Sequence, residues 1–471
     1  MKKQLIINLL LPLICVCIYF NLISINPYFN TKDFIENIEV LSSPEYKGRL
    51  TGHIGSLNTG KFIEDKFNKF NIIPVGDKGT YTQSFPLNVV QLSGECSFKA
   101  FDSRGNLLKE YKYGKDFKEL GFGKSIKGSI KGEVSSTISD SKPIYLFRQE
   151  MITEVDDIYK LDDVLTQHKV KAAIYTTESD FRFRTPYKLQ QNYDSGVMKI
   201  MVTKDVSNQI NSFLSMGVTF EIKTNTENKK VQGYNIVGMI KGLDESLPPI
   251  VLSSHLDHVG YDSDGIIYPG ALDNASGTSF IIELAKTLKN SKPTRNIILA
   301  CFDAEEVGLL GSKHFVSKPP IPLKGANAIN LDMVACTKDI PLSVLSNQKN
   351  DLSKEILEIM NTLKIESNEL NMDNSDHASF TPKGIDSITL IHDDTEKIHT
   401  PLDTVKNISE HRVIDVVRVV KSYLSKHNII DEDSIQIHEN IAMVEFYSRY
   451  IILSFVTLIL LNILLFIRQR K

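Results

Sequence analysis

Apolar runs in the second half of the chain end repeatedly in acidic residues or histidine. The run VLSS precedes His255, and the run NIILACF precedes the DAEE segment. Apolar runs of this length are typical of buried strands. Ligands of open α/β sheets bind beyond the carboxyl ends of such strands. We therefore expect one crevice to collect the residues that end these runs, together with a later histidine: His255, Asp257, Asp273, Glu305, Glu306, Asp332 and His399.

The same pattern predicts the elements between these clusters. Strands are expected at residues 234–240, 250–254, 296–302, 327–331 and 387–391, and helices at 60–70, 276–288, 308–316 and 352–363. A last helix is expected to follow an N-cap at Ser409. The predicted fold class is α/β, with a mixed, mostly parallel central sheet flanked by helices.

Residues 89–230 interrupt this pattern. They alternate between apolar and polar residues around Cys96–Phe101, and the runs KVKAAIYTT, MKIMVTKD and VTFEIKT read as strands between polar turns. The segment therefore predicts a β-rich inserted domain. It divides the enzyme domain into residues 32–88 and residues 231–426.

Both termini contain long uncharged stretches. Residues 4–30 carry no charge and could span a bilayer, which takes about 20 residues. Because no clear cleavage site follows, residues 1–31 are predicted to be an uncleaved signal anchor, with a cleaved signal peptide as the alternative. After a linker at 427–449, residues 450–467 are predicted to form a transmembrane helix, and residues 468–471 a basic cytoplasmic tail. Membrane lipid is then a partner, and the domain between the spans lies outside the cytoplasm.

Composition narrows the class of protein. The 471 residues are 42% hydrophobic and 24% charged, which suits two or three packed domains. The net charge of -3 indicates no nucleic-acid partner, and five cysteines give no disulfide framework. The clustered carboxylates and histidines, without cysteine, are the ligands of a divalent metal bound through nitrogen and oxygen.

Five of these motifs occur in a recognisable order. HLD, GALDNASG, DAEEVGLLGS, NLDM and IHTPLDT resemble the metal motifs of the M28 family of co-catalytic zinc aminopeptidases, over roughly residues 35–425. The segment LSSPEYKGRLTGHIGS, with Gly48 and Arg49, resembles the N-terminal segment of the family, although it also reads as a solvated loop. Residues 89–230 resemble a protease-associated (PA) domain, with an unrelated β-rich insertion as the alternative.

The resemblance implies a role for each candidate residue. Two zinc ions per chain would share Asp273, one completed by His255 and Asp332 and the other by Glu306 and His399. Glu305 would be the general base, and Asp257 would orient the imidazole of His255. Asp376, in SDHASF, would contact substrate, with a turn residue as the alternative.

Two further positions are less well assigned by the motifs. His258 reads as a structural histidine beside the metals rather than a ligand. Ile398 stands where some family members carry a tyrosine that polarises the substrate carbonyl, so no oxyanion partner is assigned.

The function implied is a membrane-anchored di-zinc metallopeptidase that hydrolyses peptide bonds with metal-activated water, most simply an aminopeptidase. Peptides are the expected substrates. The alternatives are a carboxypeptidase or a glutaminyl cyclase of the same fold, or a receptor-like relative without activity. The sequence leaves open the preferred N-terminal residue, the in vivo metal and the oligomeric state.

Overall fold

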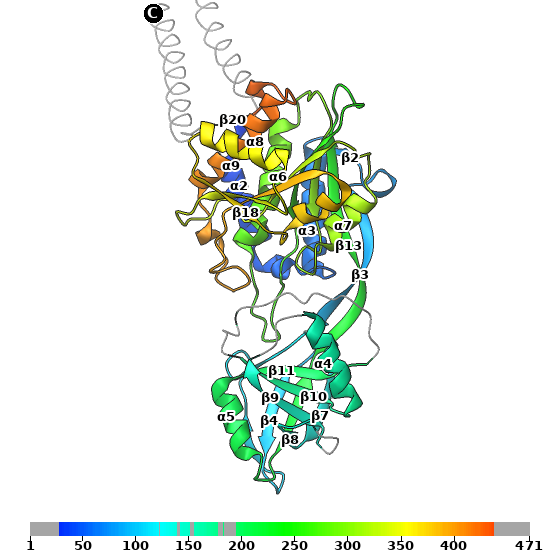
Figure 1. Cartoon of the computed structure of the whole chain (residues 1–471), viewed down its shortest axis with the longest axis vertical. Helices are drawn as coiled ribbons and strands as arrows, with labels where there is room; N and C mark the ends of the chain where they lie inside the picture. The colour runs from blue at the N-terminus through cyan, green and yellow to red at the C-terminus, as the bar shows by residue number, and fades with distance from the viewer. Residues whose placement is uncertain are drawn as a thin grey trace, which may run out of the picture.

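The computed structural model describes residues 28–121, 123–138, 142–150, 155–177, 182 and 195–437. These residues form two lobes that lie one above the other in Figure 1. The main lobe is built around a nine-stranded sheet, and the inserted lobe consists of residues 93–225. The two predicted terminal spans lie outside the described residues. Within the described ranges, no helix is both long enough and apolar enough to cross a bilayer.

The main sheet has the strand order β18-β17-β19-β16-β14-β15-β13-β2, with β3 also paired to β13. Its strands are β2 (Ile73–Pro74), β3 (Thr82–Leu92), β13 (Thr226–Ile240), β14 (Ile250–His255), β15 (Ile297–Phe302), β16 (Asn327–Leu331), β17 (Leu342–Ser346), β18 (Ser367–Asn371) and β19 (Asp386–Ile391). The central strands β15, β14, β16 and β19 run parallel, whereas β13–β15 and β17–β19 are antiparallel. The predicted mixed sheet is confirmed. The expectation that it is mostly parallel holds only for its centre and for the β17–β18 edge.

Both faces of the sheet centre are covered, which explains why a central strand such as β15 is apolar throughout. Alternate residues of β15 enter different cores: Ile297, Leu299 and Cys301 pack on one side, and Ile298, Ala300 and Phe302 on the other. The first core receives α2 (Thr31–Leu41), α3 (Ile54–Lys69), α6 (Gly277–Leu288), α8 (Asp351–Thr362) and α9 (Glu410–Lys426). The second receives α7 (Leu310–Ser317).

The predicted helices are therefore present, with two local differences. Ile63, Phe67 and Phe70 of the expected apolar face are buried, whereas Phe62 is only partly buried. Ser409 precedes α9, as predicted, but its side chain makes no capping hydrogen bond.

The inserted lobe contains two sheets that pack against each other. One has the order β6-β11-β10-β9-β8 and the other the order β5-β4-β12-β7. Their bounds are β4 (Ser97–Phe101), β5 (Leu107–Glu110), β6 (Phe117–Glu119), β7 (Gly128–Gly132), β8 (Val134–Ser135), β9 (Ile144–Glu150), β10 (Ala172–Thr177), β11 (Met198–Thr203) and β12 (Thr219–Thr224), with helices α4 (Val155–Gln167) and α5 (Lys204–Phe213). Side chains of β10 and β11 share a core with Phe98 and Phe220 of the second sheet. The strands predicted here are confirmed, whereas the PA-type classification stays a prediction.

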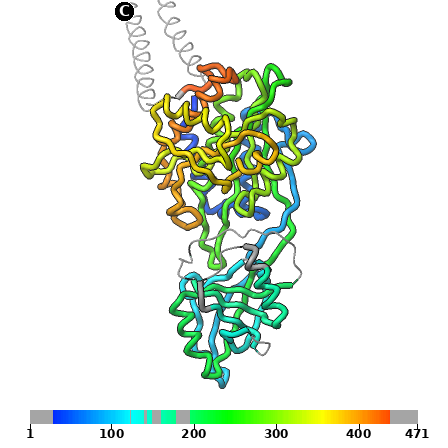
Figure 2. The backbone as a smooth tube through the Cα atoms, viewed as in Figure 1, coloured from blue at the N-terminus to red at the C-terminus, as the bar shows by residue number. Residues whose placement is uncertain are grey.

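A two-stranded ribbon joins the lobes. β3 and β13 pair antiparallel from Thr226 opposite Leu92 to Ile236 opposite Thr82, and the tube in Figure 2 shows both strands passing from one lobe to the other. The predicted division of the enzyme domain at residues 89 and 230 therefore falls within paired strands. At the other end of the main lobe, β1 (Tyr28–Phe29) pairs with β20 (Gln436–Ile437), which brings the two ends of the described chain together.

Candidate metal centre

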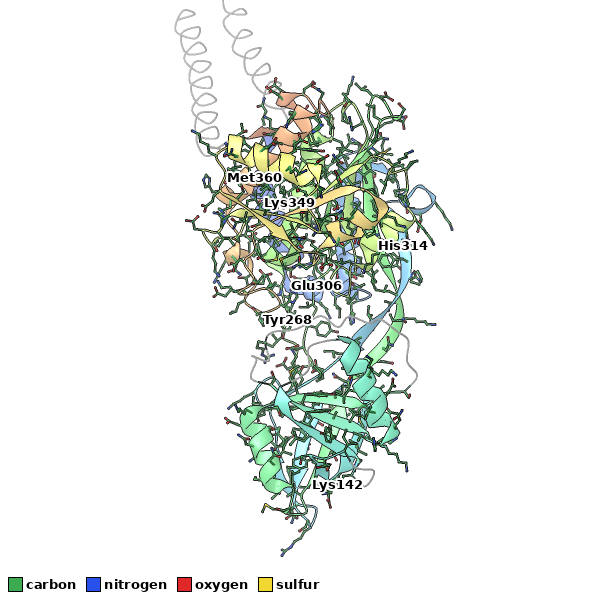
Figure 3. The ribbon with its side chains drawn as sticks, in the orientation of Figure 1. Lys142, Tyr268, Glu306, His314, Lys349 and Met360 are labelled. Carbon is green, nitrogen blue, oxygen red and sulfur yellow. The ribbon has the colours of Figure 1, made fainter. Side chains whose placement is uncertain are left out.

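The five predicted metal ligands meet at the carboxyl edge of the parallel strands. His255 ends β14, Glu306 follows β15 and Asp332 follows β16. Asp273 lies in the turn η3 (Ala271–Ser276) before α6, and His399 lies in the loop after β19. In Figure 3, Glu306 lies at the edge of the main lobe that faces the inserted lobe. The sequence rule that ligands gather beyond strand ends therefore describes this site correctly.

Asp273 occupies the centre of the cluster. Its Oδ1 lies 3.3 Å from His255 Nε2, which in turn lies 3.2 Å from Asp332 Oδ1. Its Oδ2 lies 3.0 Å from His399 Nε2, which is 3.2 Å from Glu306 Oε2. The two carboxylate oxygens of Asp273 thus face two separate groups of donors. In each group the donor atoms lie within 4.8 Å of one another.

The buried carboxylates of the cluster give it an excess of negative charge that bound cations would balance. Asp273, Glu306 and Asp332 are each at most 6% exposed. Burial lowers the pKa of His255 and His399, but the surrounding carboxylates, Asp332 for one and Glu306 for the other, outweigh it and hold both pKa values well above the usual range. Like charges packed together away from water are unfavourable unless cations compensate them. Nitrogen and oxygen donors in this arrangement fit divalent zinc.

Asp257 connects the metal cluster to the loop that carries the two glutamates. Its carboxylate accepts the backbone N–H groups of Glu305 at 3.1 Å and Glu306 at 3.3 Å, and the hydroxyl of Thr51 at 3.1 Å. Asp257 Oδ1 lies 3.7 Å from His255 Nδ1, which is beyond hydrogen-bonding distance. Asp257 therefore holds the glutamate loop through hydrogen bonds, and it lies near the imidazole of His255 without bonding to it.

Glu305 and Glu306 have different surroundings, as predicted. Glu306 belongs to one of the donor groups, whereas Glu305 belongs to neither and lines the neighbouring cavity. Burial raises the pKa of Glu305 well above its usual range, against the opposing effect of His255, and the carboxylate of Glu306 raises it further. A carboxylate with a raised pKa beside a metal site suits a group that accepts a proton near neutral pH.

Two groups that are not among the five predicted ligands hold the Asp273 turn. Asp403 accepts the N–H groups of Leu272 at 2.8 Å and of Asp273 at 3.1 Å. The guanidinium of Arg49, which is 1% exposed, donates to five backbone carbonyls: Leu41, Leu256, Pro269, Gly270 and Asp273. The solvated-loop alternative for the Arg49 segment is therefore wrong. Asp403 was present in the IHTPLDT motif, but nothing in its spacing indicated this role.

Strained backbone also distinguishes the site. Ala304, Met333 and His399 adopt positive φ values of 61°, 50° and 55°, a region that non-glycine residues rarely occupy. Each lies at or next to a predicted functional residue. Such strain collects where the surrounding structure fixes functional side chains, and the sequence carried no signal for it because none of the three is glycine.

His258 and Asp376 occupy positions that the motifs did not specify. His258 Nδ1 lies 3.0 Å from Glu306 Oε1 and 3.7 Å from Asp273 Oδ2, so the imidazole joins one donor group. Asp376 is fully buried and does not line the cavity, and burial raises its pKa to about 7. Its position does not support the predicted direct contact with substrate.

A cavity of ≈ 230 Å³ opens beside the cluster. His255, Asp273, Glu305, Glu306, Asp332 and His399 line one part of it, and the apolar side chains of Leu309, Met333, Leu345, Ile391 and Ile398 line another. Asp373 and Asp393, both exposed, complete the rim together with Asn374, Ser375 and Thr395. The cavity thus combines a metal-binding wall, an apolar wall and an acidic rim.

Residues 235–424 match the family model of Peptidase family M28. Over these residues the chain is similar to family M28. The match runs from β13 into α9 and includes all five predicted ligands, whereas Arg49 and the inserted lobe lie outside it. The resemblance to M28 seen in the motifs is confirmed.

Curated proteins match part of this chain. Aminopeptidase YwaD of Bacillus subtilis is 35% identical over 194 residues, which cover 38% of this chain and 41% of that protein. A glutamate carboxypeptidase 2 homolog of Caenorhabditis elegans is 31% identical over 137 residues, 28% of this chain and 16% of that protein. The chain therefore aligns with less than half the length of these curated relatives.

The fold extends further than the sequence similarity. The solved structure of BSAP, a zinc aminopeptidase from Bacillus subtilis, has a TM-score of 0.65 at 20% identity, covering 86% of this chain and 99% of that one. An aminopeptidase from Aneurinibacillus sp. strain AM-1 gives a TM-score of 0.62 at 21% identity, with 85% and 94% covered. At such identities the likeness shows a shared fold.

Proposed function

We propose that this chain is a zinc-dependent M28 metallopeptidase with two zinc ions per chain, and that it acts as an aminopeptidase. The two donor groups that share Asp273 support the number of ions. His255 and Asp332 would hold one ion, and Glu306 and His399 the other. Names of relatives and fold neighbours, which include zinc aminopeptidases, support the choice of metal.

The residues of the chain would divide the reaction between them. When bound, zinc makes a water nucleophilic at neutral pH and stabilises negative charge on the substrate carbonyl. Glu305 lines the cavity beside both donor groups and would take the proton from the attacking water and deliver it to the leaving amine. Asp257 would keep Glu305 in place through the backbone N–H group of that residue.

The charge of the side chains that line the cavity favours an aminopeptidase over a carboxypeptidase. Of the described residues that line it, none is lysine or arginine, and Asp373 and Asp393 lie on the rim. A carboxypeptidase needs a cation to hold the C-terminal carboxylate, whereas an acidic rim attracts a protonated amino group. The apolar wall, which includes Leu345 and Ile391, would accept an apolar first side chain.

A peptide panel tests this proposal. We expect the purified zinc-loaded chain to release the N-terminal residue of peptides that begin with leucine and have a free amino group. N-acetylation of the same peptides should abolish the reaction. C-terminal amidation should leave the rate unchanged. Cleavage that survives N-acetylation and is lost on amidation would instead identify a carboxypeptidase.

We also propose that the chain is held in a membrane, with the lobes outside the cytoplasm. The support comes from the sequence alone: the uncharged stretches at residues 4–30 and 450–467 and the basic residues beyond them. Lipid would then be a partner of both ends of the chain.

A further inference from the structure

The segment between His258 and Gly270 extends from the metal centre to the inserted lobe. This segment, residues 259–269, is called the linking loop below. It joins the end of β14 to the turn that carries Asp273. Tyr268 of the linking loop lies between the two lobes in Figure 3. The loop therefore connects two metal motifs and reaches the inserted lobe.

A buried ion pair fixes the linking loop to the inserted lobe. Lys118 Nζ, on β6, lies 2.6 Å from Asp262 Oδ1. The hydroxyl of Tyr268 donates to Asp262 Oδ2 at 2.7 Å and accepts from Lys118 Nζ at 3.1 Å. Lys118, Asp262 and Tyr268 are each at most 1% exposed. A buried charge that loses its partner is strongly unfavourable, so this contact constrains the loop tightly.

A second set of hydrogen bonds lies next to the ion pair. The N–H of Ser263 donates to the phenol oxygen of Tyr113 at 3.2 Å, and Asn225 Nδ2 donates to Ser263 Oγ at 2.7 Å. Tyr113 and Asn225 both belong to the inserted lobe, and Arg182 of the same lobe also pairs with Asp262 at 3.1 Å. The tip of the linking loop is thus held by several residues that the M28 match does not include.

The other end of the linking loop is tied to the metal turn through Arg49. Gly260 N donates to the Gly48 carbonyl at 2.9 Å, and a Cβ on Gly48, whose φ is +63°, would lie 2.1 Å from the Gly260 oxygen. Arg49 follows directly and donates to the carbonyls of Pro269 at 2.7 Å and of Gly270 at 2.7 Å. A displacement of the loop would therefore be transmitted to the turn that presents Asp273.

We propose that the inserted lobe positions the metal centre through the linking loop, and that Lys118 is a positioning residue for zinc binding. This inference rests on the proposed zinc site. Lys118 does not line the cavity and belongs to neither donor group. It neutralises and locates Asp262, and the loop so fixed sets the backbone that leads into the Asp273 turn. The inserted lobe would then be needed for metal affinity, apart from any contact with peptides.

The chain offers a matched control for this role. Lys199 Nζ and Asp162 Oδ2 form a second buried ion pair at 2.5 Å, with both side chains 0% exposed, but this pair lies wholly inside the inserted lobe. Lys118→Met and Lys199→Met each remove one buried cation of the lobe. Of the two, only Lys118→Met removes a contact to the linking loop.

The test measures zinc affinity of the purified full chain by competition with a chromophoric chelator, and zinc content by atomic spectroscopy. We expect Lys118→Met to bind zinc at least tenfold more weakly than wild type, and Lys199→Met to stay within twofold of it. Lys118→Arg, which restores the charge, should recover most of the affinity. If Lys118→Met gives no folded protein, Tyr268→Phe removes only the bridging hydroxyl and should weaken zinc binding about threefold.

Three results would contradict the proposal. Zinc affinity equal to wild type in the folded Lys118→Met or Tyr268→Phe chain would overturn the positioning role. An equal loss in Lys199→Met would do the same, because it would reflect general loosening of the lobe. A wild-type chain that binds no zinc would overturn the proposed function itself, which the wild-type zinc content reveals separately.

Discussion

Two neighbouring glutamates illustrate how much depends on a single residue position. Glu306 belongs to a donor group and Glu305 does not, although the sequence places them side by side. We expect Glu305→Gln to keep both zinc ions and to lose roughly 10²–10⁴-fold in kcat, the usual contribution of general acid–base catalysis. Zinc content and kcat measured on the same preparation check this. Loss of metal would mean that the roles of the two residues are exchanged.

The histidines of the two donor groups allow the two proposed ions to be removed separately. His255→Ala should lose the ion shared with Asp332, and His399→Ala the ion shared with Glu306, because each histidine contributes the only neutral donor that the motifs predict for its group. Zinc counted per chain after dialysis should fall by one in each variant. Full activity in either variant would show that the substituted histidine is not a zinc ligand.

His392 gives a prediction about pH that does not involve the metals. It is 1% exposed, its Nδ1 accepts the N–H of Ala335 at 3.0 Å, and burial lowers its pKa to about 3. The unfolded chain takes up this proton near pH 6.5, but the folded chain does not until about pH 3, so the contribution of His392 to stability is lost as the pH falls through this window. By pH 5 this lowers the free energy of unfolding by about 2 kcal/mol.

Urea denaturation of the zinc-free chain at pH 7 and pH 5 measures this loss. In His392→Asn, which keeps an acceptor near Nδ1 but cannot titrate, the difference in unfolding free energy between the two pH values should be smaller by about 2 kcal/mol. An unchanged difference would show that His392 is not the titrating group.

The ligands could be predicted from the sequence, whereas most of their support could not. The motifs of His255, Glu306 and Asp332 combine a strand pattern with a carboxylate or histidine, and both parts are local in sequence. Arg49 donates to backbone carbonyls that are distant in sequence, such as that of Asp273. Because every residue has a backbone carbonyl, the sequence does not indicate which ones Arg49 contacts. Asp376 is buried and does not line the cavity, which the SDHASF motif could not indicate, because a motif does not reveal which way a short turn directs its side chain.

At the scale of elements, Arg49 joins the segment before α3 to the turn before α6. We expect Arg49→Met to lower the unfolding free energy by at least about 3 kcal/mol, because several buried carbonyls lose their donor at once. Lysine should not restore it, since it lacks the planar set of five donors. Arg418→Met, which removes a half-exposed surface pair with Asp415, should cost less than about 1 kcal/mol. Similar losses in both variants would contradict the special role of Arg49.

The sheet shows a similar division between predicted and unpredicted elements. Strands β14, β15, β16 and β19 were predicted because both their faces are buried, which makes them continuous apolar runs. The edge strand β18 and its neighbour β17 were not predicted. Residues of β18 are largely accessible, and its sequence SNELN has no apolar pattern to recognise.

At the scale of the whole molecule, the proposed topology predicts a simple pattern of digestion. Protease added to intact cells should cut the two lobes, because the positive-inside rule places both basic ends in the cytoplasm and the residues between them outside. Tags placed before Lys2 and after Lys471 should be cut only after lysis, and a cytoplasmic protein serves as the integrity control. Lobes that stay protected until lysis would contradict this topology.

The ribbon of β3 and β13 also bears on the order in which the molecule folds. Leu92 and Thr226 are paired partners, yet the whole inserted lobe lies between them in the sequence. Closing a loop of that length in an unfolded chain costs roughly 4 kcal/mol of entropy. If the inserted lobe folds first, its own core brings these two residues together. β13 can then pair along β3 into the main sheet without a further loss of loop-closure entropy. The inserted lobe would thus act as a folding nucleus, and slow folding of the main lobe is the expected result whenever the core of the inserted lobe is weakened.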